Sequence, residues 1–399
     1  MLPAILRLAA PALLPFSAMG ANVYVQNSGY VGAETNSNVD LTPGGQAEVN
    51  GYSIDLASLI GIATPNSETN IRPRVDYREY PTESDDNRLE EFLDFNSYYK
   101  GQRSSFAISG TLDHRDEFNA EQNSAEFNDL NPNQPTSPQT GRTITGATRD
   151  SVYAVPSYTY NFSPLFAVGA NALYEKVNYS PNDDQRFVDF DYYQAKLFVI
   201  WTLNPKSDLT FGAYGNKFNA TRFDSKETAE GASVDLNTTW TPLFSTHAQV
   251  VLQRADIDYG IPPGFSGSVN AWGGQIGVLY KTQTQALRAN LTRLITPSGG
   301  GSVYISNQAQ VQYDQRFTQR LSFTTATIYL QNRALTAQAS GDGRDYMRSI
   351  ISAKWMVSRT FYLQGGYQYT WQKYQLDPDG AANNRFFVQF GYQGLGRQW

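Results

Sequence analysis

The sequence predicts an all-β fold, a transmembrane antiparallel up-and-down β-barrel of about 18 strands, with 16 strands as the alternative. Three observations support this fold class. Apolar and polar residues alternate with a period of two along most of the chain, the alternating segments are long, and short and long connectors follow one another in turn. Because successive side chains of a strand point to opposite faces, each segment has one apolar and one polar wall.

The segment from Phe361 to Lys373 is the clearest strand. One of its faces is aromatic and aliphatic, and the other carries amides and other polar groups. Such segments run for roughly 11 to 15 residues, whereas strands of soluble proteins usually have about five or six. A tilted strand that crosses a membrane needs about 9–11 residues. The lengths therefore favour membrane-crossing strands over those of a soluble sandwich.

The connectors predict both the number of strands and the positions of the chain ends. Eight are tight: Thr64–Glu68, Lys100–Arg103, Asn161–Pro164, Asn204–Ser207, Thr241–Leu243, Lys281–Thr284, Arg316–Gln319 and Val357–Thr360. Nine longer polar connectors alternate with them: Thr35–Ala47, Pro81–Asn87, Glu117–Ala147, Ser180–Arg186, Asp224–Thr228, Gly260–Ser268, Pro297–Ser302, Thr336–Asp345 and Gln375–Asn384. Seventeen connectors imply eighteen strands, and an even number places both mature ends on the tight-turn side, which is periplasmic in bacterial barrels.

Three strands carry particular expectations. The first, Val23–Ala33, has the weakest pattern. The segment Phe187–Trp201 changes phase at Tyr192–Tyr193, which predicts a β-bulge there. In the last strand Phe386 and Tyr392 are in phase but the terminal Trp399 is not. Either the strand ends at Tyr392, or a bulge near Gly394–Gly396 restores the phase.

The composition excludes several classes of protein. After residue 20 there is no run near the roughly 20 apolar residues of a spanning helix. A net charge of −6 with scattered basic residues argues against a nucleic-acid partner. An aromatic content of 14% argues against disorder. The absence of cysteine excludes disulfides and thiolate metal sites.

Residues 1–20 have the features of a secretory signal peptide. Arg7 precedes an apolar stretch, and Ala18–Gly20 has the small-x-small pattern of a cleavage site. A short buried helix is the alternative, and three prolines count against it. We therefore expect one exported barrel domain over residues 21–399.

Aromatic residues recur beside the tight turns. Rings with an apolar body and a polar tip settle at the headgroup boundary, so we expect a girdle there. The alternative is that strand ends in any β-protein can carry such rings. The predicted girdle residues are Phe162, Phe166, Trp201, Trp240, Phe244, Phe317, Trp355 and Phe361.

Charged residues occupy the polar phase of three consecutive early strands, where they predict a charged lumen wall. We expect Arg78 to lie opposite Glu90, and Arg74 opposite Asp94, because opposite charges across an antiparallel pair are favourable. This wall could be a constriction that sorts solutes by charge, or an ion-pair ladder that braces the barrel. Its residues are Arg72, Arg74, Asp76, Arg78, Glu90, Asp94, Asp113 and Arg115.

Amides dominate the polar phase of the later strands. They predict a neutral lumen wall far from the charged one, with Gln389, Asp235 and Asn237 beside it. Amides form hydrogen bonds with sugar hydroxyls as well as with water. This wall could therefore line a saccharide path, or it could simply be hydrated. The residues are Gln308, Gln310, Gln312, Gln364, Gln368 and Gln372.

The connector 117–147 is long and acidic, and loops of this length are often functional. It could fold inward as a constriction, or lie outside and bridge cations with lipopolysaccharide. Catalysis is not expected, because neither His114 nor His247 stands near a nucleophile or a paired-carboxylate motif. No metal site, cofactor or phosphate loop is predicted either.

The chain resembles Gram-negative outer-membrane β-barrels, and more narrowly the β-barrel porin 2 type found with exopolysaccharide gene clusters. The segments 70–78, 156–164 and 385–392 carry this likeness. The resemblance implies an outer-membrane location, both mature ends in the periplasm, and outer-membrane lipid, lipopolysaccharide and the barrel-assembly machinery as partners.

Three functions follow as hypotheses. The first is a pore that passes small hydrophilic solutes through an aqueous lumen, which a barrel of this width allows. The second is an outer-membrane component of exopolysaccharide export. The third is a structural or adhesive barrel with a blocked lumen. The solute, the state of the lumen and the oligomeric state stay open.

Overall fold

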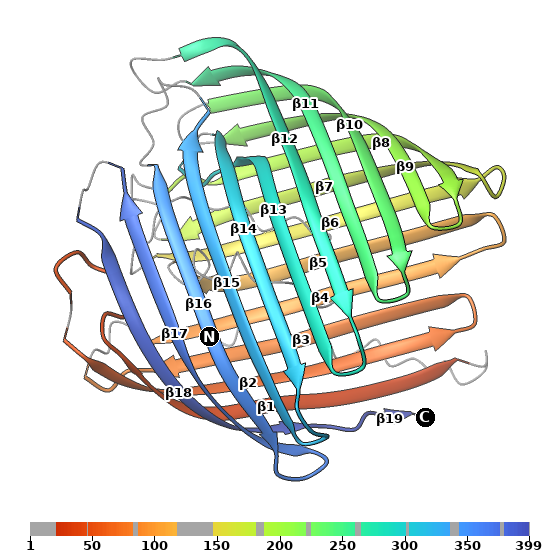
Figure 1. The fold of residues 1–399 in the computed structure, drawn as a ribbon. Coiled ribbons are helices and arrows are strands. Elements are labelled where there is room, and N and C mark those ends of the chain that lie inside the picture. The colour runs from red at the N-terminus through yellow and green to blue at the C-terminus, as the bar shows by residue number, and fades with distance from the viewer. Residues whose placement is uncertain are drawn as a thin grey trace.

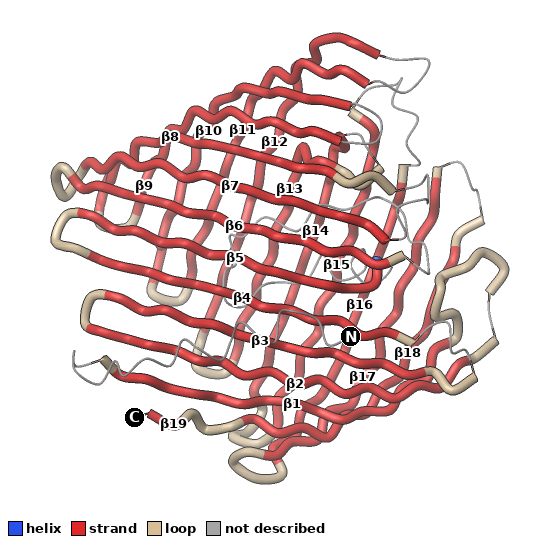
Figure 2. Tube along the Cα trace, turned by 180° about the vertical axis from the view of Figure 1, so that it is seen from behind, coloured by secondary structure: helices blue, strands red, loops and turns tan. Residues whose placement is uncertain are grey.

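The computed structural model describes residues 21–45, 47–82, 87–117, 147–180, 187–220, 225–259, 265–300, 303–335, 343–375 and 379–398. Within them, a single antiparallel sheet closes on itself into a barrel of eighteen long strands (Figures 1 and 2). The predicted fold class is confirmed, and the long strands have 13–17 residues.

The strands follow chain order around the barrel. Their bounds are β1 Asn22–Asn36, β2 Val49–Thr64, β3 Ser67–Glu79, β4 Arg88–Lys100, β5 Ser104–Asp116, β6 Thr148–Asn161, β7 Phe166–Ser180, β8 Phe190–Asn204, β9 Ser207–Ala220, β10 Ser225–Thr241, β11 Phe244–Tyr259, β12 Phe265–Lys281, β13 Gln285–Pro297, β14 Val303–Arg316, β15 Leu321–Ala334, β16 Arg344–Met356, β17 Phe361–Tyr374 and β18 Ala381–Gln393. Strands separated by tight turns and by longer connectors alternate as the sequence predicts.

The barrel closes where its first and last strands pair. Ser28–Asn36 of β1 pair with Arg385–Gln393 of β18. The short strand β19, Arg397–Gln398, then pairs with Val25 and Tyr24 in a register advanced by one residue. Gly396, with a φ of 68°, lies at this break. The predicted bulge near Gly394–Gly396 is therefore present, while Trp399 lies outside the described residues.

Both ends of the barrel chain lie at the tight-turn rim. Asn22 of β1 pairs with Ala63, next to the first tight turn, and Tyr392 of β18 pairs with Phe361, next to the last. The first strand, for which the sequence pattern was weakest, is continuous and longer than predicted, from Asn22 to Asn36.

The bulge predicted at Tyr192–Tyr193 is wrong. Both residues pair in unbroken register with β7 and β9. Tyr193 is exposed on the outer face, whereas Tyr192 packs against an apolar cluster inside the barrel. An inward aromatic residue, and not an extra residue, therefore produces the change of phase. Two prolines do interrupt the ladder: the β2–β3 pairing lapses beside Pro73, and the β6–β7 pairing lapses beside Pro156.

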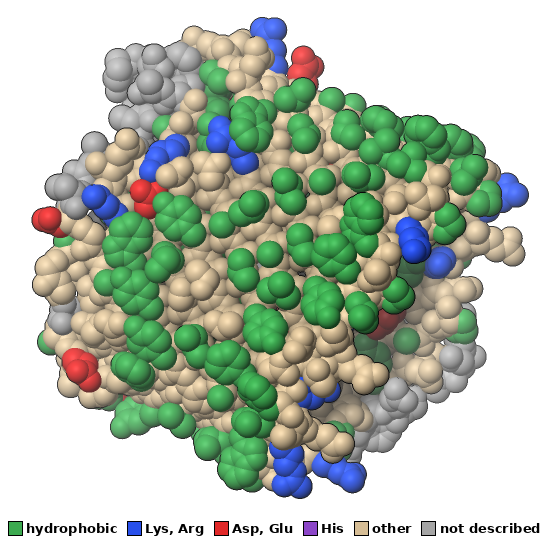
Figure 3. Space-filling model, viewed as in Figure 1, with side chains coloured by type: hydrophobic (Ala, Val, Ile, Leu, Met, Phe, Trp, Pro, Cys, Tyr) green, Lys and Arg blue, Asp and Glu red, His purple; other side chains and the backbone are tan. Residues whose placement is uncertain are grey.

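The outer face of the barrel is apolar. On the side seen in Figure 3, hydrophobic side chains spread across the strands and charged ones gather toward the edges. Leu56, Leu197, Leu252, Ile276 and Val388 are among the large side chains exposed there. The eight predicted girdle residues lie on or beside tight turns, and all but Phe244 are strongly exposed.

Among the residues that the structure describes, no helix is long and apolar enough to cross a membrane.

Two apolar clusters narrow the interior at the rim of the longer connectors. Leu41, in the connector between β1 and β2, packs against Ile328, Leu330, Tyr346 and Ala381 from β15, β16 and β18. This connector therefore folds into the barrel. The connector 117–147, for which the inward fold was one expectation, lies outside the described residues between its two ends.

The second cluster centres on β7–β11 and extends to β14 and Leu335. It joins inner-face residues of β9 and β11, such as Phe218, Ala255 and Ile257, with Val303 and the partly buried Ile295 and Ile305. In the alternation of β13 and β14, Val303, Ile295 and Ile305 fall on the same side as Leu291 and Val311, which are exposed on the outer face. The ends of β13 and β14 therefore pass inside the layer formed by β9–β12.

Candidate functional site

The candidate site is the inner wall of the barrel, where polar side chains surround two separate cavities. The first has a volume of about 290 Å³ and lies among β1, β3–β5 and β16–β18; we call it the charged cavity. The second, of about 440 Å³, lies among β7–β14; we call it the amide cavity.

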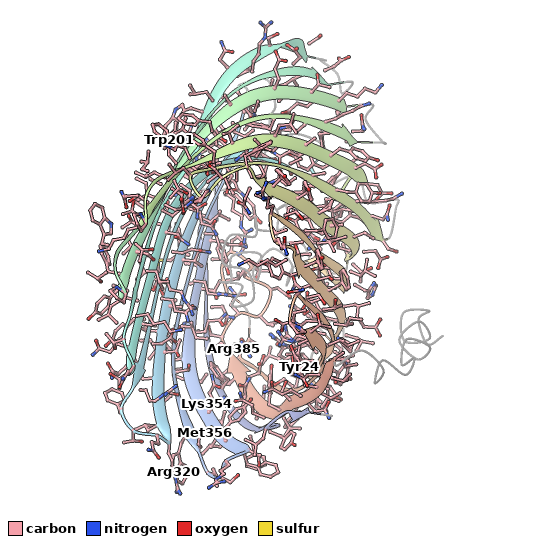
Figure 4. All side chains as sticks on the ribbon, turned by 90° about the vertical axis from the view of Figure 1, so that its right-hand side faces the viewer. Tyr24, Trp201, Arg320, Lys354, Met356 and Arg385 are labelled. Carbon is pink, nitrogen blue, oxygen red and sulfur yellow. The ribbon has the colours of Figure 1, made fainter. Side chains whose placement is uncertain are left out.

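The charged cavity contains more cations than anions on its surface. Six guanidinium groups and three carboxylates line it: Arg74, Arg78, Arg88, Arg115, Arg348 and Arg385, with Glu34, Asp76 and Glu90. Figure 4 shows Arg385 on the inner side of the wall, with Lys354 further toward the tight-turn rim, where Arg320 lies.

Asp76 forms ion pairs with two of these arginines from within the wall. Its carboxylate lies 3.1 Å from Nε of Arg78 and 3.7 Å from Nη2 of Arg74. Nε of Arg74 also donates to Asp55 Oδ2 over 2.6 Å. The Asp76 side chain is only 2% exposed, while that of Arg74 is 34% exposed. The carboxylates are thus buried in the wall and hold the guanidinium group toward the lumen.

Glu34 and Arg385 repeat this arrangement across the barrel closure. Nε of Arg385 donates to Glu34 Oε2 over 2.9 Å, and the hydroxyl of Tyr80 donates to Glu34 Oε1 over 2.6 Å. The Glu34 side chain is 1% exposed and that of Arg385 is 12% exposed. Tyr80 lies just beyond β3, and burial, together with the nearby Glu34 carboxylate, raises its pKa to about 12. The Tyr80 hydroxyl therefore stays protonated and able to donate at neutral pH.

An aromatic ring separates two of the arginines. The guanidinium groups of Arg74 and Arg115 lie 5.1 and 5.3 Å from the centre of the Phe92 ring. Arg115 is also anchored, because it donates to Asp113 over 2.9 and 3.0 Å. Cation–π contacts of this kind hold a planar guanidinium group in place without neutralising its charge.

The structure places all eight residues of the predicted charged wall on the inner face, but the predicted register is wrong. Arg78 lies opposite Arg88, and Arg74 lies opposite Phe92. Asp76 pairs with Glu90, and Arg72 pairs with Asp94, whose carboxylate accepts from Thr111 over 3.1 Å. The centre of the β3–β4 hairpin lies one residue before the assumed position, which shifts every cross-strand partner by two residues.

The predicted amide wall is divided between the two cavities. Gln308 and Gln310 line the amide cavity, whereas Gln364, Gln368 and Gln389 line the charged cavity. Barrel closure causes this division, because it sets β17 and β18 beside β1. The expectation of an amide wall that lies entirely far from the charged wall is therefore wrong.

Two of the amides have local structural partners. Gln312 donates to Asp314 Oδ2 over 2.9 Å. Gln372 is buried and donates to the carbonyl oxygen of Leu41 over 3.1 Å, so it holds the inward connector.

The amide cavity has one central carboxylate. Asp235 lies 3.3 Å from Nζ of Lys196 and 3.8 Å from Nε2 of His247, and it accepts from Gln249. His114, in contrast, lies on the outer face, 2.7 Å from Asp150. Among the described residues, no group of three or more potential metal-ligating side chains comes together.

Sequence reasoning missed several residues of the charged cavity. Glu34 and Arg385, and Asp55 behind Arg74, come from β1, β18 and β2, whose charged residues were not grouped with the wall. Arg88 begins β4, beside the predicted Glu90. Phe92 could have been found, because it is an aromatic residue in the polar phase of β4. Its position between two arginines depends on cross-strand register, which the sequence did not reveal.

Comparison with known proteins adds a few distant likenesses. No family model matches the chain, and no curated protein matches it. Solved structures from Pseudomonas aeruginosa are similar over 94% of this chain and 98% of theirs: OccK5 (OpdH), at 11% identity and a TM-score of 0.45, and OccK2 (OpdF) in complex with glucuronate, at 12% and 0.44. The outer membrane protein opdK covers 94% of this chain at 10% identity and a TM-score of 0.43. Because these values are low, the description of the fold depends on the strand pairing itself.

Proposed function

We propose that this chain is an outer-membrane pore for small hydrophilic solutes, with a preference for anions. A closed barrel satisfies its backbone hydrogen bonds internally, which is the condition for strands to span lipid. The apolar outer face and the aromatic residues at the tight turns support the same location. We infer that the tight-turn rim, with both chain ends, faces the periplasm.

The observation that carries the anion preference is the unequal exposure of the charged pairs. The carboxylates of Asp76, Asp113 and Glu34 are 1–3% exposed, whereas the arginine partners of theirs that line the cavity are 12–34% exposed. A solute in the charged cavity therefore meets guanidinium groups first. Guanidinium binds carboxylate and phosphate oxygens through paired donors.

Ion selectivity in a planar bilayer tests this function. We expect the wild-type protein to conduct in KCl and to give an anion-selective reversal potential across a salt gradient. Arg74→Glu should move that potential toward cation selectivity. Arg254→Glu is the matched control, because Arg254 is 61% exposed on the outer face. An unchanged potential in Arg74→Glu would refute the charged cavity as the selective element.

The other two hypotheses remain as narrower alternatives. The amide cavity supports a saccharide path, as expected of a component of exopolysaccharide export. Gene neighbourhood and uptake of neutral oligosaccharides into vesicles would distinguish it from the anion pore. The inward connector around Leu41 and the second apolar cluster support a blocked barrel. A folded protein that never conducts would favour that alternative.

A further inference from the structure

The barrel wall is split between two consecutive strands. β12 and β13 pair only from Gly274 to Lys281 with Ala286 to Arg293. Beyond this point, Phe265–Gly273 pair with β11 and Leu294–Pro297 pair with β14, and the two strands run apart (Figure 1). Backbone groups that face lipid without partners are costly, so this split needs a physical explanation.

An outer-face pocket lies at the start of the split. We call it the wall pocket; its volume is about 500 Å³, within the range of about 300–1,000 Å³ typical of small-molecule sites. Apolar side chains such as Trp272, Ile276 and Leu291 line it. Gln249, Gln275 and Gln308 line both this pocket and the amide cavity, so the two spaces share one thin wall.

Arg293 stands where the strands separate. It shares the outer-face phase of Leu291, and its guanidinium group lies 4.5 Å from the centre of the Trp272 ring. Its Nε donates to the carbonyl oxygen of Trp272 over 3.1 Å, and its Nη1 donates to Asn307 over 2.9 Å. Arg293 thus satisfies one carbonyl of the open β12 edge.

The charge of Arg293 has no counterpart nearby. Arg293 lines both the wall pocket and the amide cavity, and among the described residues its guanidinium group forms no ion pair with a carboxylate. An arginine on the lipid-facing side of a barrel costs about 2–4 kcal/mol at the membrane midplane and less near the interfaces. Such a residue points to a ligand that offers negative charge.

We propose that the split between β12 and β13 is a lateral port for an amphiphile with one acyl chain and a carboxylate head. The acyl chain occupies the wall pocket beside Ile276 and Leu291. The carboxylate pairs with Arg293 in place of the Trp272 and Asn307 contacts, and then reaches the amides of the amide cavity. The apolar cluster that joins β9–β12 to β13 and β14 closes the split above the pocket.

Photoactivatable dodecanoate tests this port in the full-length protein in nanodiscs. A probe with its reactive group beside the carboxylate should label Gln275 or Gln308, and a probe with the group at the chain end should label Ile276 or Leu291. We expect saturable binding that Arg293→Gln weakens at least tenfold, since it removes a charge-assisted hydrogen bond. Dodecanol should bind both proteins equally.

Arg333→Gln is the matched control, because Arg333 is an outer-face arginine whose Nη2 lies 2.8 Å from Asp345, outside the pocket. It should leave dodecanoate binding unchanged. Equal binding to wild type and Arg293→Gln would overturn the port, and so would labelling spread around the outer face. Head-group labelling confined to Trp272, or Arg293-dependent binding of lipopolysaccharide but not of dodecanoate, would indicate a surface lipid site instead. KCl conductance, recorded separately, reports on the proposed pore whether or not the port exists.

Discussion

The two cavities are built from the same kind of wall but differ in how many charged side chains line them. In the charged cavity, buried carboxylates stand behind arginines that face the lumen. In the amide cavity, one carboxylate, Asp235, faces Lys196, His247 and Gln249, and neutral amides provide much of the remaining surface. In both cavities the carboxylate is less exposed than its cationic partner. The comparison therefore teaches that the number of such pairs, and not their orientation, distinguishes the two walls.

The largest expected effect is on the buried pair at the barrel closure. Glu34→Ala leaves Arg385 without its bidentate partner, and breaking a buried pair in this way costs about 3–5 kcal/mol. The same change at the more exposed Asp235 should cost clearly less. Unfolding by guanidinium in lipid vesicles, followed by tryptophan fluorescence, measures both. Equal costs would show that the two walls are braced alike.

Leu41→Ala tests the connector that narrows the charged side. Leu41 is 2% exposed, and truncation of a buried leucine costs about 2–5 kcal/mol. We expect lower stability together with a higher single-channel conductance, because the connector loosens. Leu395→Ala, at a residue that is 72% exposed, is the control and should change neither. An unaltered conductance in a destabilised Leu41→Ala protein would separate the connector from the conducting path.

Phe92→Leu should have a smaller effect. It removes the ring between Arg74 and Arg115, and an exposed cation–π contact contributes about 0.5–1 kcal/mol. The two guanidinium groups should become less ordered, and anion selectivity should fall only partly. Phe106→Leu changes an outer-face ring that is 43% exposed, and it should preserve the reversal potential. A complete loss of selectivity in Phe92→Leu would mean that the ring does more than position its neighbours.

The smallest effect belongs to the amide cavity. Gln310→Leu changes no charge, so the reversal potential should stay within experimental scatter. The bilayer recordings used for Arg74→Glu provide the comparison. A shift as large as that of Arg74→Glu would remove the distinction between the two cavities.

The barrel itself was predictable because its signal is repeated. Alternation along each strand separates the inner face from the outer face, and the alternating connectors predicted eighteen strands and the side on which the chain ends lie. Inner-face residues such as Arg74 and Gln310 could be assigned for the same reason. This reasoning depends only on local periodicity, which each strand carries by itself.

The arrangement of the site was not predictable, because it depends on register and closure. A shift of two residues in the cross-strand pairing keeps every side chain on its face but changes its partner, as it did for Arg78 and Glu90. Closure brings Glu34 and Arg385 together across most of the chain. The split at β12 and β13 does leave a trace in the alternation pattern, because Arg293 occupies the outer-face phase of Leu291, but which strands separate there depends on pairing.

The pairing of β1 with β18 and β19 also has a consequence for how the molecule is made. β1 lacks a pairing partner on one side until residues 385–398 have been synthesised and have reached it. A shorter chain would form an open sheet with two unpaired edge strands, which can pair with other chains. A truncation before Arg385 should therefore accumulate as aggregates or be degraded by proteases, even though nearly all of the wall has already been synthesised.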